Sequence, residues 1–439
     1  MHIRAFLSAL TTSDRAGLLG LSMFCFFAWL GTSPAYIGLL IMLLALLPYR
    51  VFDLWKTLPR IISLLALVFF AYVIVLSLIA QWRVPEFAEV HRAGIWEWGS
   101  LLLVVVVAYW LAVFRRCWPL FLALAVVGLT IDMAIAIVQD WSHYIESLSG
   151  YRFNFGKPQL ATGFYAAMAL IALFCLWSSA RQYLRVPVLI AAAAIWGICF
   201  MVQLSGVVFT QPRVVWMALI AVLVVVVASF LIRLAKNPFT LKRLSWTPVV
   251  VFLLVAVSAW VVMPVIEKRL ADEREVVMSI VENDGALYDH NSSLVYRIGL
   301  LVYGIELVKS KPVLGHGPGT SRPLIKMHAE PRMQRWPHLH NGYLEVMVRL
   351  GLLGAVLFSA WLVAMLFHFM KNTKRHKCFS ALRGFILLNL VLLLVYSIGN
   401  YRLDHVDMRF YWYIVIGYML SFAFPSFIAS RLSAAKRLT

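Results

Sequence analysis

The chain has 439 residues, of which 62% are hydrophobic and only 13% charged, and its mean hydropathy is +0.84. This composition excludes a soluble globular protein of this length, and the long unbroken apolar runs exclude a β-barrel, whose strands alternate apolar and polar residues. The sequence therefore predicts an all-α membrane protein, a polytopic bundle of transmembrane helices.

Twelve apolar runs, bounded by charged residues, Pro or Gly, are predicted to span the membrane. They are residues 16–32, 34–49, 61–82, 96–114, 118–141, 160–179, 186–208, 213–234, 246–266, 341–369, 378–398 and 410–428. Residues 1–15 lack the apolar core and cleavage site of a signal peptide and are interpreted as a cytoplasmic lead-in. Three parts follow: residues 1–266 with nine spans, a large loop at 267–340, and residues 341–439 with three spans and a tail.

Lysine and arginine residues gather in the connectors on one side of the predicted bundle, such as FRRCW, RLAKNPFTLKR and KNTKRHK. The positive-inside rule therefore predicts that these connectors and both termini face the cytoplasm. The net charge of +19 is then mainly a topology signal, with anionic membrane lipids beside it. Basic residues scattered over short connectors argue against a nucleic-acid partner.

Residues 267–340 are predicted to form a polar, partly helical loop on the outer side, and a loop of this length tends to be functional. Its stretch SSLVYRIGLLVYGIELVKSKP predicts an amphipathic helix on or near the membrane surface, with Ser292 as N-cap and Pro312 as stop. A nucleotide-binding loop follows a strand and ends in GK[ST], and the next stretch, KPVLGHGPGT, has neither feature. It predicts a tight turn that lets backbone pack closely.

The stretch HLHNGYLEVMVR, at the junction of loop and span, holds the strongest candidates for chemistry. If it begins a helix, His338, Glu345 and Arg349 line one face, whereas His340 points elsewhere. Glu345 and Arg349 are spaced to neutralise each other as an i,i+4 pair. A histidine at the membrane–water boundary, with an ordinary pKa near ~6.5, suits proton abstraction.

The histidines of the outer loop do not predict a metal site. Their spacings match no familiar ligand set, and neither cysteine nor an HExxH motif accompanies them. The five histidines concerned are His290, His316, His328, His338 and His340.

Basic residues from separate outer connectors are candidates for binding an anionic group. They are Arg152 and Lys157 in SGYRFNFGKP, Arg213 in TQPRVVW, Arg297 in SSLVYRIGL and Arg402 in IGNYRLD. Arginine binds phosphate oxygens through two hydrogen bonds and keeps its charge. One such residue is best explained by snorkelling to lipid headgroups, but several together favour a pyrophosphate site. The sequence assigns no role to Asp132, alone in its span.

Three of these motifs resemble the O-antigen ligase family, within a wider group that includes O-antigen polymerases and bacterial O-oligosaccharyltransferases. They are TQPRVVW before a span, SLVYRIGLLVYGIELVKSKPVLGHGPG with its glycine turn, and HLHNGYLEVMVRLGLLG leading into a helix. The spans and the single late loop fit the family along the whole chain, whereas the motifs cover a small part of it.

The resemblance implies a glycosyltransferase of the bacterial inner membrane that needs neither metal nor cofactor. It would move a glycan from undecaprenyl pyrophosphate to a sugar hydroxyl of lipid A-core on the periplasmic face, with inversion at the anomeric carbon. Pyrophosphate is already a good leaving group, so the protein has only to hold its charge, orient the partners and remove the acceptor proton.

On this interpretation His338 is the general base, with His340 as the second candidate. Arg213 and Arg297 bind the pyrophosphate. Further candidates for substrate binding are Arg152, Lys157, Arg402, Asn341 and Glu345.

Four other functions stay open at this point. An O-antigen polymerase uses the same donor with a lipid-linked glycan as acceptor. A protein-directed oligosaccharyltransferase is disfavoured by the short tail after residue 428. A twelve-helix transporter is disfavoured because the chain lacks two matching six-helix halves. A structural scaffold would predict that His338→Ala has no effect.

Overall fold

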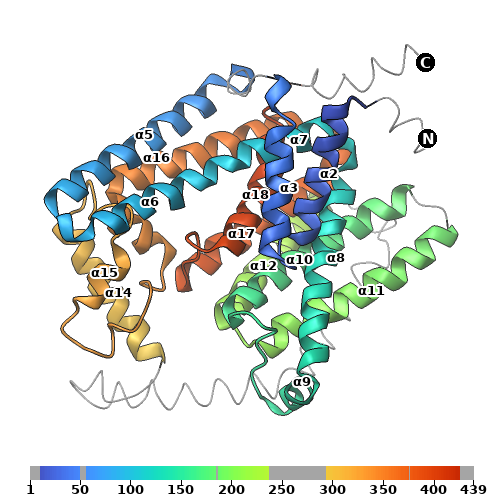
Figure 1. Ribbon diagram of the computed structural model, residues 1–439. Helices are drawn as coiled ribbons and strands as arrows, with labels where there is room; N and C mark the ends of the chain where they lie inside the picture. Colours follow the sequence, from blue (N-terminus) through green and yellow to red (C-terminus); the bar gives the residue numbers. More distant parts are fainter. Residues whose placement is uncertain (1–9, 50–55, 184–185, 237–292, 375, 426–439) are drawn as a thin grey trace.

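The computed structural model describes residues 10–49, 56–183, 186–236, 293–374 and 376–425, and every regular element in these ranges is a helix (Figure 1). The α-helices are α2 (Thr12–Phe27), α3 (Thr32–Leu44), α5 (Arg60–Arg83), α6 (Ala88–Ser100), α7 (Val104–Val113), α8 (Trp118–Gln139), α9 (Trp141–Glu146), α10 (Gln159–Tyr183), α11 (Val186–Phe209), α12 (Arg213–Lys236), α14 (Ser293–Ser310), α15 (Ser321–Lys326), α16 (Gly342–Thr373), α17 (Ser380–Gly399) and α18 (Val406–Ser421). Short 3-10 turns are η1 (Leu47–Tyr49), η2 (Pro85–Phe87), η3 (Leu101–Leu103), η4 (Arg115–Cys117), η5 (Ser147–Ser149) and η7 (Lys377–Phe379).

Eight helical segments among the described residues are long and apolar enough to cross a membrane. They are Arg60–Arg83, Pro85–Val113, Arg115–Gln139, Gln159–Arg181, Val186–Phe209, Arg213–Ile232, Gly342–Thr373 and Lys377–Gly399. Each overlaps one predicted span, so the polytopic helical membrane fold is confirmed, whereas the count of twelve is not.

The remaining four predicted spans explain the difference. Span 246–266 lies outside the described residues. Helices α2 and α18 have 16 residues each and α3 has 13, fewer than the ~20 that a span needs. The predicted runs were longer because they included apolar residues of the adjoining turns, such as Ala28 and Trp29, whose hydropathy carries no information about where a helix ends.

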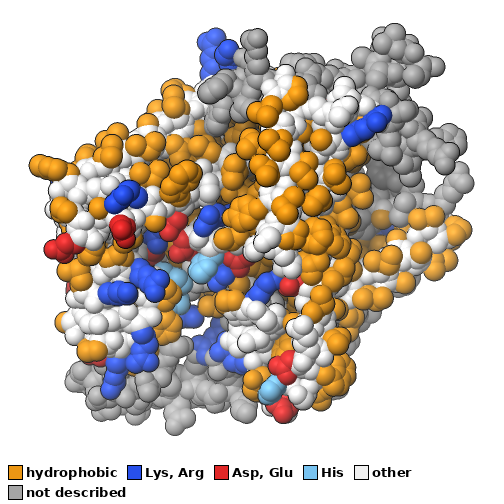
Figure 2. Space-filling model, in the orientation of Figure 1, with side chains coloured by type: hydrophobic (Ala, Val, Ile, Leu, Met, Phe, Trp, Pro, Cys, Tyr) orange, Lys and Arg blue, Asp and Glu red, His pale blue; other side chains and the backbone are white. Residues whose placement is uncertain are grey.

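Helix α18 forms the centre of the bundle and is buried along nearly its whole length, with α7 packed beside it (Figure 1). A helix that is apolar all round is stable only when other helices cover every side of it. By contrast, α5, α11 and α12 expose many large apolar side chains, including Leu67, Val188 and Ile220. Hydrophobic side chains cover much of the face shown in Figure 2, as expected of a surface that contacts lipid.

Helix α16 is broken at Gly351, whose φ of 64° and ψ of −176° are not helical. The break deprives carbonyls before it and N–H groups after it of their helical partners. The turn after α14 replaces these partners: His316 N and Gly317 N donate to the carbonyls of Val348 and Arg349 at 2.8 and 3.0 Å, and Leu352 N and Leu353 N donate to the carbonyls of Pro312 and Val313 at 2.9 and 3.2 Å. The close backbone packing predicted for the glycine turn is therefore confirmed.

Gly351→Ala is expected to destabilise the protein by at least ~1–3 kcal/mol. The substitution requires an L-residue to adopt a positive φ, and its Cβ would lie 2.2 Å from the Val313 carbonyl oxygen. Thermal unfolding of the detergent-purified variant measures the effect. Gly99→Ala is the matched control, since its Cβ would have no neighbour within 4 Å and alanine favours helix α6. Equal unfolding temperatures for the two variants would contradict the role of the break.

The described part of the large loop, residues 293–340, packs on α16 through α14. A second apolar cluster joins them, and its buried members are Tyr296, Leu300, Ile325, Met333, Leu339 and Val348. Helix α14 ends at Ser310, shortly before the predicted stop at Pro312, while the predicted N-cap Ser292 lies outside the described residues. The position of α14 on the membrane surface stays a prediction.

Candidate active site

The two candidate histidines lie side by side in a tight bend just before α16. His338 and His340 are only 6% and 8% exposed, and their ring centroids are 4.2 Å apart. His340 has a φ of +54°, uncommon for a side chain other than glycine, and its backbone N–H donates to Nδ1 of His338 at 3.1 Å. Trp336 packs edge-on against the His340 ring at 4.8 Å. The bend therefore turns both rings to the same place, although one residue separates them.

Helix α16 begins at Gly342, so the predicted stripe of His338, Glu345 and Arg349 on one helical face is wrong for His338. Asn341 is the N-cap, and its side-chain oxygen accepts from the N–H groups of Tyr343 and Leu344, both at 3.0 Å. A residue that caps a helix adopts extended backbone, which is why the histidines before it leave the helical register.

Glu345 ties the histidine bend to the helix. Its carboxylate accepts from the backbone N–H of Leu339 at 3.1 Å, and its own N–H donates to the carbonyl of Asn341 at 2.9 Å. Asn341 and Glu345, which the sequence suggested for substrate contacts, both hold the bend in place through these bonds. A contact with substrate stays a prediction for both residues.

Arg349 joins four parts of the chain beneath the bend. It is 4% exposed and contacts a Glu345 carboxylate oxygen at 2.9 Å, which confirms the predicted i,i+4 pair. It also donates to Glu97 of α6 at 2.9 Å and to the Ser321 hydroxyl of α15 at 2.9 Å. The ring of Tyr401 covers its guanidinium at 4.9 Å. This cation therefore holds together the residues around it beneath the histidine bend, which we call the floor of the site: Glu345, Glu97, Ser321 and Tyr401.

Asp404 also faces this floor and was not singled out from the sequence. Its Oδ2 lies 4.0 Å from Arg349, and its Oδ1 is buried without a hydrogen-bond partner among the described residues. Its negative charge raises the proton affinity of His338 and partly opposes the effect of burial. The sequence feature that could have identified Asp404 is its position two residues after Arg402 in the same short connector.

Arg297 of α14 approaches the site from the loop side. Burial is the main reason that the pKa of Arg297 is lowered, and its Nε has no hydrogen-bond partner within the described part of the chain. Its charge acts on His340 and interacts with Tyr396 of α17. The hydroxyl of Tyr396 accepts from the Asn400 side chain, so this arginine, the histidines and the end of α17 meet in one region.

Arg213 and Arg402 lie at the same end of the bundle. Arg213 begins α12, and the next residue, Val214, packs so closely against Gly399 at the end of α17 that a Cβ there would lie 2.9 Å from it. Arg402 is 9% exposed and binds Asp407 at 2.7 Å. Figure 2 shows lysine, arginine and histidine side chains around a hollow in the middle of this face.

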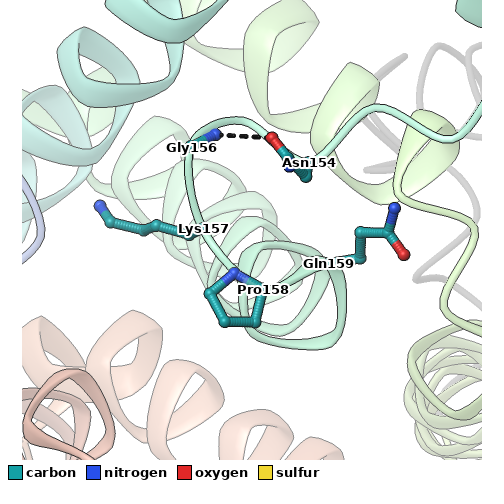
Figure 3. Close-up of a pocket in the computed structure, with 5 residues that line it drawn as sticks. All are labelled: Asn154, Gly156, Lys157, Pro158 and Gln159. Atoms are coloured by element: carbon teal, nitrogen blue, oxygen red, sulfur yellow. Dashed lines mark hydrogen bonds between the residues drawn. The ribbon is translucent and has the colours of Figure 1, made fainter.

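Arg152 and Lys157 lie in the connector before α10, which also lines an open cavity of about 440 Å³ (Figure 3). The guanidinium of Arg152 donates to the Thr210 carbonyl at 3.3 Å. The ammonium of Lys157 binds the carboxylate of Asp132 and the Trp29 carbonyl. Asp132 thus compensates the charge of Lys157, which leaves that cation less attraction for an anionic ligand.

Both histidines are held neutral at physiological pH. Burial, followed by the charge of Arg297, lowers the pKa of His340 to about 3. Burial, followed by the neighbouring His340, lowers the pKa of His338 to about 3. Each ring therefore carries one N–H and one lone pair, the form in which an imidazole accepts a proton. No group of three or more His, Cys, Asp or Glu side chains arranged for a metal ion occurs among the described residues.

The geometry thus combines neutral histidines with arginines from separate elements at one end of a membrane bundle. Residues 198–359 match the family model described as O-Antigen ligase. Over this segment the chain is similar to the O-antigen ligase family. The matched segment carries Arg213 and Arg297, both histidines and the Glu345–Arg349 pair, whereas Arg402 and Asp404 lie beyond it. No curated protein matches the chain.

The family match accounts for a glycosyltransferase-like enzyme that acts on lipid-linked glycans in general. It agrees with the resemblance that the three sequence motifs carried, since TQPRVVW, the α14 segment and HLHNGYLEVMVRLGLLG all fall inside residues 198–359.

Proposed function

We propose that the protein is an O-antigen ligase that transfers a glycan from undecaprenyl pyrophosphate to a sugar hydroxyl of lipid A-core. The reaction takes place on the periplasmic face of the bacterial inner membrane, with both termini in the cytoplasm, and needs no metal. The observation that carries this proposal is the buried imidazole of His340 beside Arg297, with both ring nitrogens unpaired among the described residues, in a segment that matches the O-antigen ligase family model.

In the proposed reaction the acceptor hydroxyl oxygen forms a bond to the anomeric carbon as the bond from that carbon to the pyrophosphate oxygen breaks. The hydroxyl proton passes to a histidine, and undecaprenyl pyrophosphate leaves with the bonding electrons. A single displacement of this kind inverts the anomeric configuration. Arg213 and Arg297 stabilise the negative charge that develops on the leaving group, with Arg402, Arg152 and Lys157 as more distant cations.

Hydrogen bonding favours His340 over His338 as the base, the reverse of the order suggested by the sequence. The Nδ1 lone pair of His338 already accepts the backbone N–H of His340 at 3.1 Å, so in the neutral ring Nε2 carries the proton. Both ring nitrogens of His340 are buried and have no hydrogen-bond partner among the described residues. The lone pair of His340 is therefore available for the acceptor proton, and His338 is suited to donate a hydrogen bond.

Arg297 couples donor binding to the strength of this base. Its positive charge disfavours protonation of His340 in the empty site. A pyrophosphate bound to Arg297 compensates that charge, so the proton affinity of His340 rises when the donor is in place. The acceptor proton is then taken up only beside a bound leaving group.

Arg213→Ala and Arg297→Ala are each expected to raise the KM for the lipid-linked donor by about 10- to 100-fold. A hydrogen bond to a charged group contributes about 1.5–3 kcal/mol. Lysine at either position should restore only part of the loss, because it cannot form the planar pair of bonds to phosphate oxygens. Initial-rate kinetics with varied donor measure this. Arg92→Ala, an exposed arginine of α6, is the control, and an equal rise in that variant would contradict the assignment.

The proposed function is tested by reconstituting the purified protein with undecaprenyl-pyrophosphate glycan and lipid A-core in the presence of EDTA. A ligase attaches the glycan to the core, and the attached sugar has inverted configuration. Glycan chains that lengthen on the lipid carrier while the core stays unmodified would identify an O-antigen polymerase, the nearest alternative. Loss of transfer in EDTA, restored by a divalent cation, would contradict the metal-free mechanism.

A further inference from the structure

A second basic cavity lies between the C-terminal end of α5 and the turn after α14. Leu76, Ile79 and Arg83 line it from α5, and Lys311, Leu314 and His316 line it from the turn. It is partly open and its own volume is only about 20 Å³, so a ligand group would bind at its mouth and not inside it. None of these residues belongs to the histidine and arginine site described above, so the cavity is separate from the residues assigned to the proposed transfer reaction.

Two cations stand at this cavity without a carboxylate partner. Within the described residues, the structure shows no ion pair for Arg83 or Lys311, and Arg83 is exposed. His316 is held separately, because its Nε2 lies 3.0 Å from the Leu307 carbonyl and 3.1 Å from the Ser310 hydroxyl. The mouth of the cavity therefore presents two positive charges, one at the end of α5 and one on the turn that His316 holds in place.

The apolar side of the cavity continues along a candidate membrane span. Next to Arg83, Trp82 is 83% exposed, and further back on α5 the side chains of Val75 and Leu78 are exposed as well. An aromatic residue followed by a cation at the end of a span is typical of the level of lipid headgroups. A lipid that lies along α5 would thus bring its phosphate to Arg83 and Lys311.

We propose that the mouth of this cavity, the α5 cavity, binds the phosphate headgroup of one anionic membrane lipid, with Arg83 and Lys311 on the phosphate and the acyl chains along α5. The turn that forms one wall also donates the His316 and Gly317 N–H groups to the broken helix α16. A lipid bound here therefore stabilises the turn against α16, and its binding does not depend on the proposed transfer reaction.

The experiment titrates the purified full-length protein in detergent with phosphatidylglycerol, phosphatidylcholine or inorganic phosphate and counts retained lipid by native mass spectrometry. The wild type is expected to retain phosphatidylglycerol in preference to phosphatidylcholine. The Arg83→Gln, Lys311→Gln double variant should bind phosphatidylglycerol roughly 30-fold more weakly, since each surface cation raises the affinity for an anionic lipid about fivefold. The Arg322→Gln, Lys326→Gln variant removes two exposed charges from α15 and should bind as the wild type does.

A second measurement tests the stabilised turn. Phosphatidylglycerol should raise the unfolding temperature of the wild type and of the α15 control, but not that of the double variant. If the double variant does not fold, Lys311→Gln alone should still weaken binding roughly fivefold. Unchanged retention in the α5 variants, equal retention of phosphatidylcholine, or displacement of the lipid by millimolar inorganic phosphate would each overturn the proposal.

Discussion

His340→Ala is expected to slow glycan transfer by about 10²- to 10⁴-fold, the usual contribution of a positioned general base. His340 offers a buried neutral imidazole with a free lone pair. Among the described residues, the imidazole that contacts its ring is that of His338, whose Nδ1 is occupied. The effect should appear in kcat with little change in the KM for the donor, because the proton moves only in the transition state. Single-turnover assays with saturating donor measure it.

His338→Ala is the matched control and should cost less, since in our proposal this ring donates a hydrogen bond and does not take the proton. The pH dependence gives a second readout. The pKa of about 3 keeps His340 in its base form at every pH above it, so the wild-type kcat/KM should stay level from about pH 5 upward and fall only in more acidic solution. A larger loss in His338→Ala, or an inflection near pH 6.5, would contradict the assignment.

Arg349→Ala is expected to destabilise the protein by about 3–5 kcal/mol, because it leaves the carboxylate of Glu345 buried without its counter-ion. Glu345 is fully buried, and Glu97 and Asp404 also lose their cation in this variant. The floor of the site should loosen with it, so both the unfolding temperature and the transfer activity should fall. The first effect is measured by heating the protein in detergent and monitoring the fraction that stays monodisperse.

Two comparisons separate the buried network from a general effect of charge. Lys371→Ala removes an exposed cation near the end of α16 and should change stability by less than about 0.5 kcal/mol. Adding Glu345→Gln to Arg349→Ala should recover part of the stability, because the unpaired charge is removed with it. If Arg349→Ala unfolds at the temperature of Lys371→Ala, the network does not hold the floor of the site.

Much of the architecture followed from composition and local spacing. Apolar runs of membrane-spanning length require helices in a bilayer, because every backbone polar group there must find a partner within its own segment. The Glu345–Arg349 pair followed from helical periodicity alone, since positions four apart are neighbours in any helix. The close packing of the glycine turn likewise followed from the absence of Cβ atoms, although its partner on α16 could not be named from the sequence.

Exact spans were less predictable, as α3 illustrates. Its 13 helical residues lie within a longer apolar run, and hydropathy does not distinguish a helix from the apolar turn that ends it. The start of α16 was displaced for a related reason. The stretch HLHNGYLE fits a helical pattern that would begin at His338. The helix instead begins at Gly342, because the Asn341 side chain caps its first turn.

The sequence by itself determined that the protein is a helical membrane protein, that part of it resembles the O-antigen ligase family, and which histidines and arginines are candidates for the site. Those properties reside in hydropathy, helical spacing and short motifs. Only the tertiary structure decided how these side chains are used. It paired Glu97 with Arg349 and Asp132 with Lys157, and it buried both histidines so that they stay neutral. Pairing and burial depend on contacts between segments far apart in the chain, about which local spacing carries no information.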